Sequence, residues 1–436
     1  MKNVDKKKVL IVGSGAREHA LAWKTKQSQR LRKLYVAPGN PGTAEIADNI
    51  AIEATDIKNL AKFADNNGIG LTIVGPDEPL ALGIANEFQA RGLPIFAPLQ
   101  NAAEIESSKR FAKHLMVMNG IPTANFQAFH SFKSAFSHAE EHFAESSDRI
   151  VIKVSGLALG KGVYICHGLS EAEFALKEIM VKQTHGPAGN TVVIEDYIEG
   201  PEISIHALCD GYSYELFPAA QDYKRAFTGD KGLNTGGMGA VAPVPWFNQY
   251  DLVGKQIVEP TLAALKKIGR TFRGNLYPGL KITKNGPMVL EYNARLGDPE
   301  TQVFMSLLKT DLIDVCEACI QGKLHEIDIE WHEGFAACVV IASGRYPIPG
   351  FETGFPISGI EQAKNIGGAL VFHGGTKIQG DKLVTAGGRV LSIVGTGDTL
   401  KKALDVAYYA AQFIQFDGSY YRNDIGEHAM RGPVFV

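Results

Sequence analysis

The first hundred residues alternate short apolar runs with stretches of helical spacing. The apolar runs predict buried strands, each followed by glycine or proline, at Val9–Val12, Leu34–Ala37, Leu71–Val74 and Ile95–Ala97. Glu18–Lys24 and Ile57–Asn66, which lie between them, have the spacing of amphipathic helices. This alternation predicts a doubly wound parallel sheet whose ligand site lies at the carboxyl ends of the strands.

Longer strands and glycine-rich loops replace this pattern from about Glu104 to Gly322. The strands predicted in this region are Ile150–Val154, Gly162–Cys166, Val192–Ile194, Ile203–Leu208 and Met288–Tyr292. Between Tyr223 and Pro245 the chain shows little periodicity, and we expect one long loop there. A loop of that length inside a compact domain usually has a function.

The remainder of the chain, from about Ile327, is rich in strands and turns. Ala336–Ala342 and Val390–Val394 are predicted strands, and Thr399–Phe413 is predicted as an amphipathic helix. A chain of 436 residues is too long for one ordinary hydrophobic core. We therefore predict an α/β protein with mixed α/β and α+β parts, made of a doubly wound N-terminal domain (1–103), a central domain (104–326) and a β-rich C-terminal domain (327–436).

Composition favours a globular enzyme, since 45% of the residues are hydrophobic and 21% are charged. A net charge of -3 gives no basic surface for nucleic acid and no polybasic patch for a membrane. The apolar run Val9–Val12 is too short for a signal peptide or a membrane span, so we expect a cytoplasmic protein. Cys316 and Cys319 lie in a helical stretch, and we expect buried thiols there rather than a zinc site.

Two glycine-containing loops follow adjacent predicted strands. Gly13 and Gly15 would suit a dinucleotide fingerprint, but Glu18 occupies the third glycine position. The second strand ends at Pro38–Gly39, where a ribose-binding acid would be expected, so a dehydrogenase is disfavoured. Each loop, the second running from Pro38 to Thr43, is either a packing turn or a turn whose free N–H groups bind a phosphate.

The segment V-I-K-V-S-G-L-A-L-G-K-G-V-Y-I predicts a glycine-rich β-hairpin. Lys153 lies in its first strand, and Lys161 projects from a loop that contains Gly156, Gly160 and Gly162. Such a loop could close over a triphosphate and neutralise its charge. The alternative is an ordinary hairpin with a solvated lysine. The segment is not a Walker loop, because the G-K-[ST] order and a following helix are absent.

Two further segments carry acids on or beside predicted strands. Glu195 and Tyr197 end one strand and Glu202 precedes the next, so this turn could offer amides to adenine and a carboxylate to ribose; alone, these would be ordinary exposed acids. Alternation along Val289–Asn293 places Glu291 and Asn293 on one strand face and Leu290 and Tyr292 on the other. A carboxylate and an amide oxygen side by side suit Mg²⁺. Arg295 follows, and its forked guanidinium could bind a carboxylate or a phosphate. The alternative to a metal site is that Glu291 and Asn293 lie on a solvated polar strand face.

Many of these segments match one known family in collinear order. The motifs are G-S-G-A-R-E-H-A-L, A-P-G-N-P-G-T-A, V-G-P-D-E-P-L, S-S-K-R-F-A-K, G-L-A-L-G-K-G-V, Q-D-Y-K-R, N-T-G-G-M-G-A, N-A-R-L-G-D-P-E-T-Q, F-H-G-G-T, G-G-R-V-L and Y-R-N-D-I-G. From Val9 to Gly426 the chain resembles the glycinamide ribonucleotide synthetases, or phosphoribosylamine–glycine ligases, of the ATP-grasp superfamily. The resemblance implies a Rossmann-like, substrate-binding N-terminal domain and a central ATP-grasp domain.

The resemblance also implies a reaction of de novo purine synthesis. ATP, glycine and 5-phosphoribosylamine would give ADP, phosphate and glycinamide ribonucleotide through a glycyl phosphate. The implied cofactors are ATP and Mg²⁺, with Mn²⁺ as an alternative metal. The partners would be these small molecules, with no nucleic acid or membrane, and the chain would stand alone as a monomer or weak dimer. Positioning and charge neutralisation should dominate catalysis, since no covalent enzyme nucleophile is needed.

Site residues follow from matching the motifs position by position. The residues implied to bind the nucleotide are Lys109, Lys153, Gly160, Lys161, Glu195, Tyr197, Ile198 and Glu202. The implied metal ligands are Glu291 and Asn293. The residues implied to bind the other substrates are Gly13, Gly15, Arg17, Gly39, Asn40, Gly42, Thr43, Asp222, Gly236, Gly239, Arg295 and Asp298. The residues implied to act in catalysis are Lys161, Asp222, Gly237 and Arg295.

These assignments give each group a role. Asp222 and Arg295 would hold the ammonium and the carboxylate of glycine, and the amides of Gly236, Gly237 and Gly239 would stabilise charge on the acyl phosphate. The Gly13–Arg17 and Gly39–Thr43 loops would bind the phosphoribosyl group.

The chain departs from the family pattern at three positions. Ser155 stands where the family usually has Asp, Tyr223 replaces the usual His, and Lys281 occupies a strand position that is usually apolar. Two other classes remain as alternatives: another ATP-grasp carboxylate–amine ligase or carboxylase acting on a purine precursor, and a non-catalytic nucleotide sensor. A sensor would need a broken metal site, whereas Glu291 and Asn293 are both present.

Overall fold

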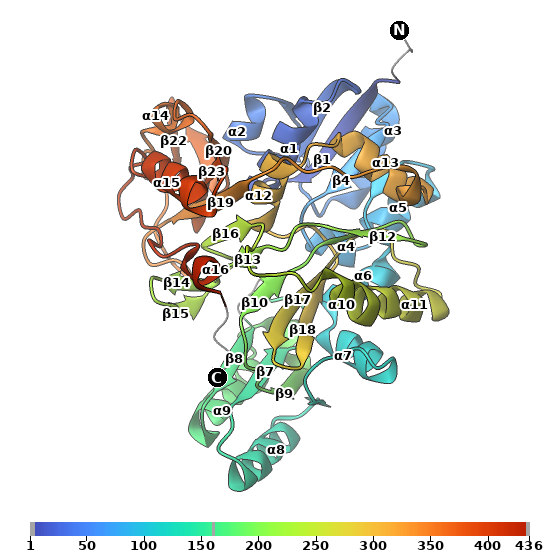
Figure 1. Cartoon of the computed structure of the whole chain (residues 1–436), viewed down its shortest axis with the longest axis vertical. Coiled ribbons are helices and arrows are strands. Elements are labelled where there is room, and N and C mark those ends of the chain that lie inside the picture. The colour runs from blue at the N-terminus through green and yellow to red at the C-terminus, as the bar shows by residue number, and fades with distance from the viewer. Residues whose placement is uncertain (1–4, 159–161, 433–436) are drawn as a thin grey trace.

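The computed structural model describes residues 5–158 and 162–432. In Figure 1 the N-terminal region (blue) and the C-terminal region (red) lie side by side at the top, and a lobe containing β7–β9 projects at the bottom. Strands β17 and β18 lie between these two upper regions and the lower lobe. Leu10, Leu280 and Leu404 belong to one buried hydrophobic cluster, so the core is continuous across all three predicted domains.

The N-terminal region contains the predicted doubly wound sheet, in which all pairs of strands are parallel. Its strands are, in spatial order, β3 (Asp48–Asn49), β2 (Leu31–Pro38), β1 (Lys7–Gly13), β4 (Leu71–Val74) and β5 (Ile95–Phe96). Its helices are α1 (Ala16–Lys26), α2 (Pro41–Ala44), α3 (Ile57–Asn67), α4 (Glu78–Ala81), α5 (Ile84–Ala90) and α6 (Gln100–Ser107). The predicted strands and helices are confirmed, and both glycine loops lie at the carboxyl edge of the sheet.

The projecting lobe is an antiparallel sheet covered by helices. Its strands are, in order, β6 (Phe126–Phe129), β9 (Val192–Asp196), β7 (Ile150–Val154) and β8 (Val163–Cys166). Its helices are α8 (Phe132–Glu145) and α9 (Leu169–Leu176), and α7 (Lys109–Met118) leads into it. The predicted hairpin is confirmed, because β7 pairs with β8.

A second antiparallel sheet connects the lobe to the rest of the molecule. Its strands are β10 (Glu202–Ser204), β11 (Ala207–Cys209), β12 (Tyr214–Leu216), β17 (Gly274–Thr283) and β18 (Gly286–Asn293), and α10 (Tyr250–Val253) and α11 (Glu259–Lys267) lie beside it. The prediction of one strand at Ile203–Leu208 was wrong, since β10 and β11 pair separately with β17. Opposite the break lies Pro278, which has no N–H to donate to a ladder.

The third sheet combines strands from both sides of the predicted boundary near 326. Its strands are, in order, β13 (Gln221–Asp222), β16 (Gly239–Ala242), β19 (Phe335–Ala342), β23 (Arg389–Gly397) and β20 (Ala369–His373). The neighbouring elements are α12 (Glu300–Leu307), α13 (Leu312–Gln321), α14 (Ile360–Lys364), β21 (Thr376–Gln379), β22 (Lys382–Thr385), α15 (Leu400–Ala411) and α16 (Glu427–Arg431). Because β16 pairs with β19 over four residues, the C-terminal region is fastened to the central one by a continuous sheet.

The prediction of one long loop between Tyr223 and Pro245 was wrong. This segment contains β14 (Arg225–Phe227) and β15 (Lys231–Asn234), which form a hairpin, as well as β16. The hairpin has mostly polar or glycine positions and lacks an alternating pattern. It is held by distant residues instead: the buried Arg422 donates to the Arg225 carbonyl at 3.0 Å and to Asp230 at 2.9 Å.

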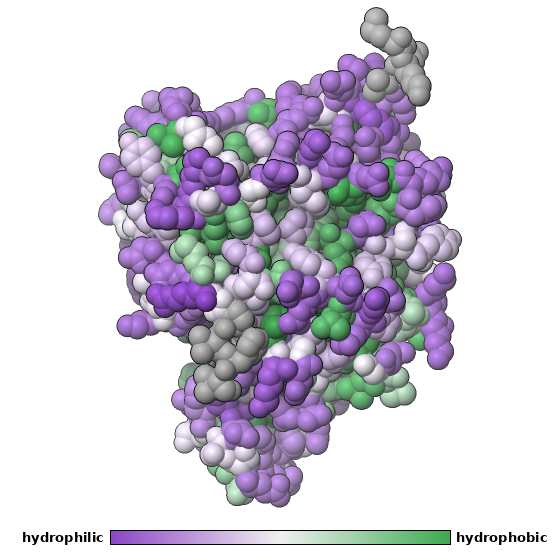
Figure 2. Space-filling model, viewed as in Figure 1, coloured by the Kyte–Doolittle hydropathy of each residue, from purple (hydrophilic) through white to green (hydrophobic). Residues whose placement is uncertain are grey.

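The cysteines, the lengths of the apolar helices and the surface complete the description of the fold. Cys316 and Cys319 are buried free thiols on α13, as predicted. Within residues 5–158 and 162–432, no helix is long and apolar enough to cross a membrane. On the face drawn in Figure 2, hydrophilic residues dominate the edges and the lower lobe, and hydrophobic ones surface mainly near the middle.

Candidate active site

Strand β18 presents the two predicted metal ligands on one face. Glu291 pairs with Gly279 and Asn293 with Tyr277, two positions apart on β17, so their side chains point the same way. The opposite face differs from the prediction, because Leu290 is the extra residue of a β-bulge between two paired positions. Val289, not Leu290, therefore shares the buried face with Tyr292.

Lysines surround Glu291. Burial opposes the negative charge of this carboxyl, but attraction by Lys109, Lys224 and Lys153 outweighs burial and lowers its pKa. The Nζ of Lys153 donates to the Leu290 carbonyl at 3.1 Å, at the bulge. The face therefore combines an ionised carboxylate, an amide oxygen and several ammonium groups, which suits a metal–polyphosphate ligand.

Glu195 has a role that the sequence did not indicate. Its carboxylate is buried and lies 2.6 Å from the Nζ of Lys153 and 2.6 Å from the Nζ of Lys113. Burial, which outweighs the attraction by Glu195, lowers the pKa of Lys113 to about 8. Sequence reasoning missed Lys113, whose place on α7 reads as an ordinary helix position. Glu195 thus fixes Lys153 instead of facing outward.

The segment after Glu195 is half-buried at Tyr197 and Ile198. The Arg149 guanidinium lies 3.7 Å from the centre of the Tyr197 ring, and the Tyr197 N–H donates to the Arg149 carbonyl at 3.2 Å. The amide of Tyr197 therefore already has a partner within the protein.

The glycine-rich loop of the β7–β8 hairpin is described only in part. Gly160 and Lys161 lie outside the described residues. At the mouth of the loop, the Ser155 hydroxyl accepts a hydrogen bond from the Arg110 N–H at 3.2 Å, and its carbonyl accepts one from the Lys109 N–H at 2.8 Å. Ser155, one of the departures from the family pattern, thus contacts the first turn of α7.

Glu202 is held by two lysines. Its carboxylate lies 3.2 Å from the Nζ of Lys224 and 3.4 Å from the Nζ of Lys281. Burial opposes the charge of Glu202, but the attraction of both lysines is larger in sum and lowers its pKa to about 2. Sequence reasoning missed Lys224, although it lies within the quoted Q-D-Y-K-R motif.

Asp222 lies beside Gly237 at the start of the third sheet. A side chain at Gly237, whose φ is +113°, would overlap with Asp222 and Pro299, so a glycine is required. The Oδ1 atom of Asp222 is buried, and among the described residues it has no hydrogen-bond partner. Burial, followed by repulsion from Glu300, raises the pKa of Asp222 well above its usual range. An ammonium group placed here would gain a partner and would restore the charge.

Arg295 is paired within the protein. Its Nη2 lies 3.1 Å from Glu106 and donates to the Asn293 side chain at 3.3 Å, and its Nη1 donates to the Leu296 carbonyl at 3.2 Å. The structure thus places Arg295 next to a predicted metal ligand.

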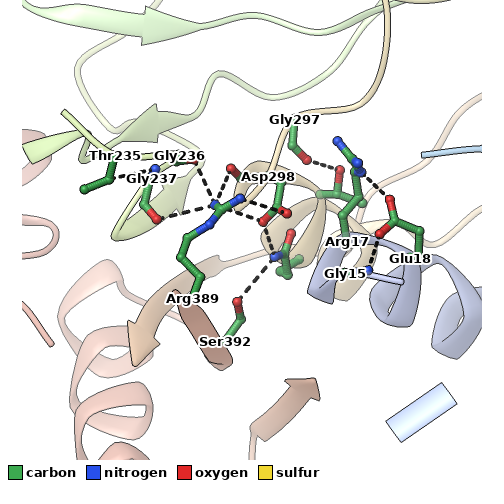
Figure 3. Close-up of polar contacts among 12 residues, drawn as sticks. Gly15, Arg17, Glu18, Thr235, Gly236, Gly237, Gly297, Asp298, Arg389 and Ser392 are labelled. Atoms are coloured by element: carbon green, nitrogen blue, oxygen red, sulfur yellow. Dashed lines mark hydrogen bonds and ion pairs between the residues drawn. The ribbon is translucent and has the colours of Figure 1, made fainter. Parts of the chain in front are cut away.

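Arg389 lies at the centre of a second group of polar contacts, around Asp298 (Figure 3). Its Nη1 donates to the carbonyls of Gly236 and Asp298, each at 2.8 Å, and its Nη2 lies 3.2 Å from the Asp298 carboxylate. Sequence reasoning missed Arg389, although the quoted G-G-R-V-L motif contains it. Its partners lie far away in the chain, so no local pattern indicated the contact.

The loop preceding β16 carries the amides that were predicted to stabilise charge on the acyl phosphate. The Gly236 N–H donates to the Tyr346 hydroxyl at 3.1 Å, and the Gly237 N–H donates to the Thr235 hydroxyl at 2.9 Å. Gly239 is buried within β16. The amides of Gly236 and Gly237 therefore have partners in this conformation, so stabilising an acyl phosphate would require them to change partners.

The Gly13–Arg17 loop is closed by Glu18. The Gly15 N–H donates to Glu18 at 2.6 Å, so this amide is not free to bind a phosphate in this conformation. A side chain at Gly13 would overlap with Glu18, which fills the space beside the turn. Arg17 donates to Glu18 at 2.6 Å (Figure 3). It also donates to the Leu296 carbonyl at 3.2 Å.

The Gly39–Thr43 loop is fastened to its neighbours. The Asn40 side chain accepts a hydrogen bond from the Thr43 N–H at 3.0 Å and donates to the carbonyls of Ser14 and His373 at 2.8 and 2.7 Å. A side chain at Gly42 would overlap with His373. The two glycine loops are thus brought together, and the C-terminal strand β20 lies against them.

Comparisons with known proteins agree with this arrangement. Sequence models of phosphoribosylglycinamide synthetase match the chain in order: its N domain at residues 7–106, its ATP-grasp (A) domain at 107–301 and its C domain at 336–428. The phosphoribosylamine–glycine ligase of Caldanaerobacter subterraneus subsp. tengcongensis is 45% identical over 96% of this chain and 99% of its own. That of Chlorobaculum tepidum is 46% identical over 97% and 100%.

Solved structures show the same fold. The crystal structure of phosphoribosylamine–glycine ligase from Thermotoga maritima superposes with a TM-score of 0.82, at 33% identity, over 96% of this chain and 100% of its own. The biotin carboxylase domain of 2-oxoglutarate carboxylase from Hydrogenobacter thermophilus has a TM-score of 0.70 at 17% identity, over 95% of this chain and 91% of its own, and shares the fold alone. The chain therefore belongs to the phosphoribosylglycinamide synthetase family.

Proposed function

We propose that this chain uses ATP to join glycine to 5-phosphoribosylamine, giving glycinamide ribonucleotide, ADP and phosphate. The observation that carries this proposal is that relatives named phosphoribosylamine–glycine ligase match almost the whole chain at about 45% identity. The geometry supports it, because Lys224 acts both on Glu291, in the lysine-rich face, and on Asp222, whose buried Oδ1 atom has no hydrogen-bond partner among the described residues.

The reaction needs two bond exchanges. A carboxylate oxygen of glycine attacks the γ-phosphorus of ATP, the bond to the β-phosphate oxygen breaks, and ADP leaves. The amine nitrogen of phosphoribosylamine then attacks the glycyl carbonyl carbon, loses a proton, and expels phosphate with the oxygen that came from glycine. Positioning and charge neutralisation supply the catalysis, since no enzyme atom becomes covalently bound.

The nucleotide would lie along the lysine-rich face. Lys109 and Lys153, together with Lys161, neutralise the phosphates, and Glu195 keeps Lys153 in place. Tyr197 and Ile198 flank the adenine, and Glu202 accepts from the ribose hydroxyls.

Glu291 and Asn293 would hold Mg²⁺ or Mn²⁺. The fit rests on their shared strand face and on the lowered pKa of Glu291, which keeps its oxygens negative. When bound there with the nucleotide, the metal supplies charge neutralisation at the phosphates.

Glycine and phosphoribosylamine would bind on the other side of the site. Asp222 accepts the ammonium group of glycine and Arg295 holds its carboxylate, with Asp298 nearby. The phosphoribosyl group would lie at the two N-terminal loops, which carry the polar side chains of Arg17 and Asn40.

The assignment is tested by ADP release with each substrate omitted in turn. ADP should form at a significant rate only when glycine and freshly made phosphoribosylamine are both present. Equal turnover with bicarbonate in place of glycine would favour the carboxylase alternative. Equal turnover with another amine would favour a different carboxylate–amine ligase.

Further proposals concern organisation. We infer domain limits of 1–103, 104–326 and 327–436, a monomer or weak dimer, and a cytoplasmic location. Light scattering on the purified chain tests the oligomeric state, and a stable higher oligomer would contradict it.

A further inference from the structure

Lys281 is the departure from the family pattern that contacts Glu202, the proposed ribose-binding acid. It lies on β17, whose positions before it, from Gly274 to Leu280, are all buried. Tyr277, Gly279 and Lys281 alternate along the strand, so they share one face. Because Gly279 pairs with Glu291, that face is also the face of the predicted metal ligands.

Lys281 is directly opposite Glu202 across the antiparallel pair β10–β17. Side chains at opposite positions lie within reach of each other. The Nζ of Lys281 lies 3.4 Å from Glu202 Oε1, while Lys224 approaches Oε2 at 3.2 Å. The two oxygens of one carboxylate are therefore each held by a different ammonium group.

A backbone carbonyl fixes the far side of the Lys281 ammonium. Nζ donates to the Gly200 carbonyl at 2.8 Å, in the turn before β10. That turn is close to β17: the Ile282 N–H donates to the Pro201 carbonyl at 3.0 Å, and a side chain at Gly200 would overlap with Ile282. The Lys281 side chain is only 14% exposed, so it lies in a defined place and does not extend freely into solvent.

These contacts indicate that Lys281 orients the Glu202 carboxylate and does not merely neutralise its charge. Each carboxylate oxygen has two acceptor sites, so an oxygen held by one lysine can still accept from a hydroxyl group. With Lys281 removed, Lys224 would still neutralise Glu202, but one oxygen would lose its anchor and the carboxylate could rotate. The charge would remain and the orientation would change.

We propose that Lys281 is a positioning residue for nucleotide recognition, which fixes the Glu202 carboxylate so that it accepts hydrogen bonds from the sugar hydroxyls of ATP. This inference rests on the proposed role of Glu202 at the ribose. It adds a determinant of sugar specificity that depends on a lysine at a position where the family pattern has an apolar residue.

The test compares the binding of ATP with that of 2′,3′-dideoxy-ATP, which lacks both sugar hydroxyls, by calorimetry on the full chain. Lys281→Met keeps an unbranched side chain of similar length and removes the ammonium. We expect ATP to bind about tenfold more weakly, the effect of weakening one hydrogen bond to a charged group, with dideoxy-ATP unchanged. The preference for ATP should therefore fall about tenfold. Lys281→Arg should restore most of it.

Two controls separate this inference from the functional proposal. Lys284→Met removes an exposed lysine from the neighbouring β17–β18 turn and should leave the preference unchanged. Glu202→Gln should lower the preference by itself, and adding Lys281→Met to it should cause no further loss.

Each other outcome overturns the inference. Equal weakening of both nucleotides by Lys281→Met would make Lys281 a simple charge for phosphates. An unchanged preference in Lys281→Met with a lowered one in Glu202→Gln would leave Glu202 at the ribose without help from Lys281. An unchanged preference in Glu202→Gln would remove the assumed role of Glu202. None of these binding results depends on ligation of glycine, which the ADP-release experiment tests separately.

Discussion

Strand β18 and the segment around Asp298 form two sides of the candidate site, and their cations differ. On the β18 side, Lys109, Lys153 and Lys224 act on the Glu291 carboxyl. On the Asp298 side the cations are arginines, and several of their donors go to backbone carbonyls. The Leu296 carbonyl, for example, accepts from Arg17 and from Arg295, each at 3.2 Å.

The difference follows from the chemistry of the two side chains. An ammonium group is a compact point charge that can exchange a protein carboxylate for a phosphate. A guanidinium has five donors in a rigid fork and can hold several acceptors at once. We infer that the lysine side serves a ligand that comes and goes, whereas on the arginine side Arg389 holds the segments around Gly236 and Asp298 in place. The following predictions test this contrast, in order of decreasing effect.

The largest effect is expected on stability, at the carboxylate of Glu195 that holds two buried lysines of the lysine side. Glu195→Gln leaves the buried Lys113 and Lys153 without their shared carboxylate. Removing one partner of a buried ion pair should lower the free energy of unfolding by about 3–5 kcal/mol. Urea denaturation measures this. Glu330→Gln, which breaks a surface pair with Lys309, should change little. An unaltered midpoint in Glu195→Gln would show that Glu195 is not structural.

On the arginine side, Arg389→Lys keeps the charge but removes the fork. A lysine cannot hold the Gly236 carbonyl and the Asp298 backbone and side chain together, so both segments should shift. Turnover should fall roughly 10²-fold, the effect of misplacing substrate groups by about 1 Å. ADP release measures this, with the exposed Arg431→Lys as control. Parent turnover in Arg389→Lys would show that the charge alone suffices there.

A smaller and reversible effect is expected at the metal. Glu291→Gln keeps the shape and removes the negative charge, so turnover at limiting Mg²⁺ should fall about tenfold, and added Mg²⁺ should restore part of it by mass action. Lys161→Ala, with an expected loss of roughly 10²-fold, should not be rescued, because a charge at the transferring phosphoryl group is missing. If Glu291→Gln turned over as fast as the unsubstituted chain at limiting Mg²⁺, Glu291 would not be a metal ligand and another residue would have to hold the metal.

The smallest effect concerns the β14–β15 hairpin and depends on pH. A hydrogen bond to Asp230 raises the pKa of His428 above its ordinary value. Its stabilisation is therefore fully present below the unfolded pKa of about 6.5 and is lost as pH rises through the folded pKa. The imidazole is half-exposed, so screening limits the effect to less than about 1 kcal/mol.

His428→Asn should therefore lower the free energy of unfolding at about pH 5.5 and leave it unchanged at about pH 9. His325→Asn, at an exposed position, serves as the control. An equal loss at both pH values would mean that His428 acts by packing against Tyr223 and not by its charge.

The sequence predicted much of the fold, because local periodicity determines which segments become strands and helices. It also placed Glu291 and Asn293 on one face, since their spacing alone decides that. It did not predict the bulge at Leu290 or the break opposite Pro278, which depend on pairing with another strand.

The arginine side could be predicted least. Arg389 meets Asp298 across 91 positions of the chain, and Glu18 closes a turn that glycine spacing alone left open. Such contacts are decided by tertiary packing. The residues Gly160 and Lys161, outside the described residues, remain predictions.

The central claim, that glycine is activated as an acyl phosphate before the amine attacks, is tested most directly by isotope transfer. Glycine labelled with oxygen-18 in its carboxylate is supplied with ATP and phosphoribosylamine, and the phosphate produced is analysed by mass spectrometry. The account predicts one labelled oxygen in each phosphate, because that oxygen bridges carbon and phosphorus in the intermediate and leaves with phosphorus. Phosphate without label, formed alongside glycinamide ribonucleotide, would contradict it.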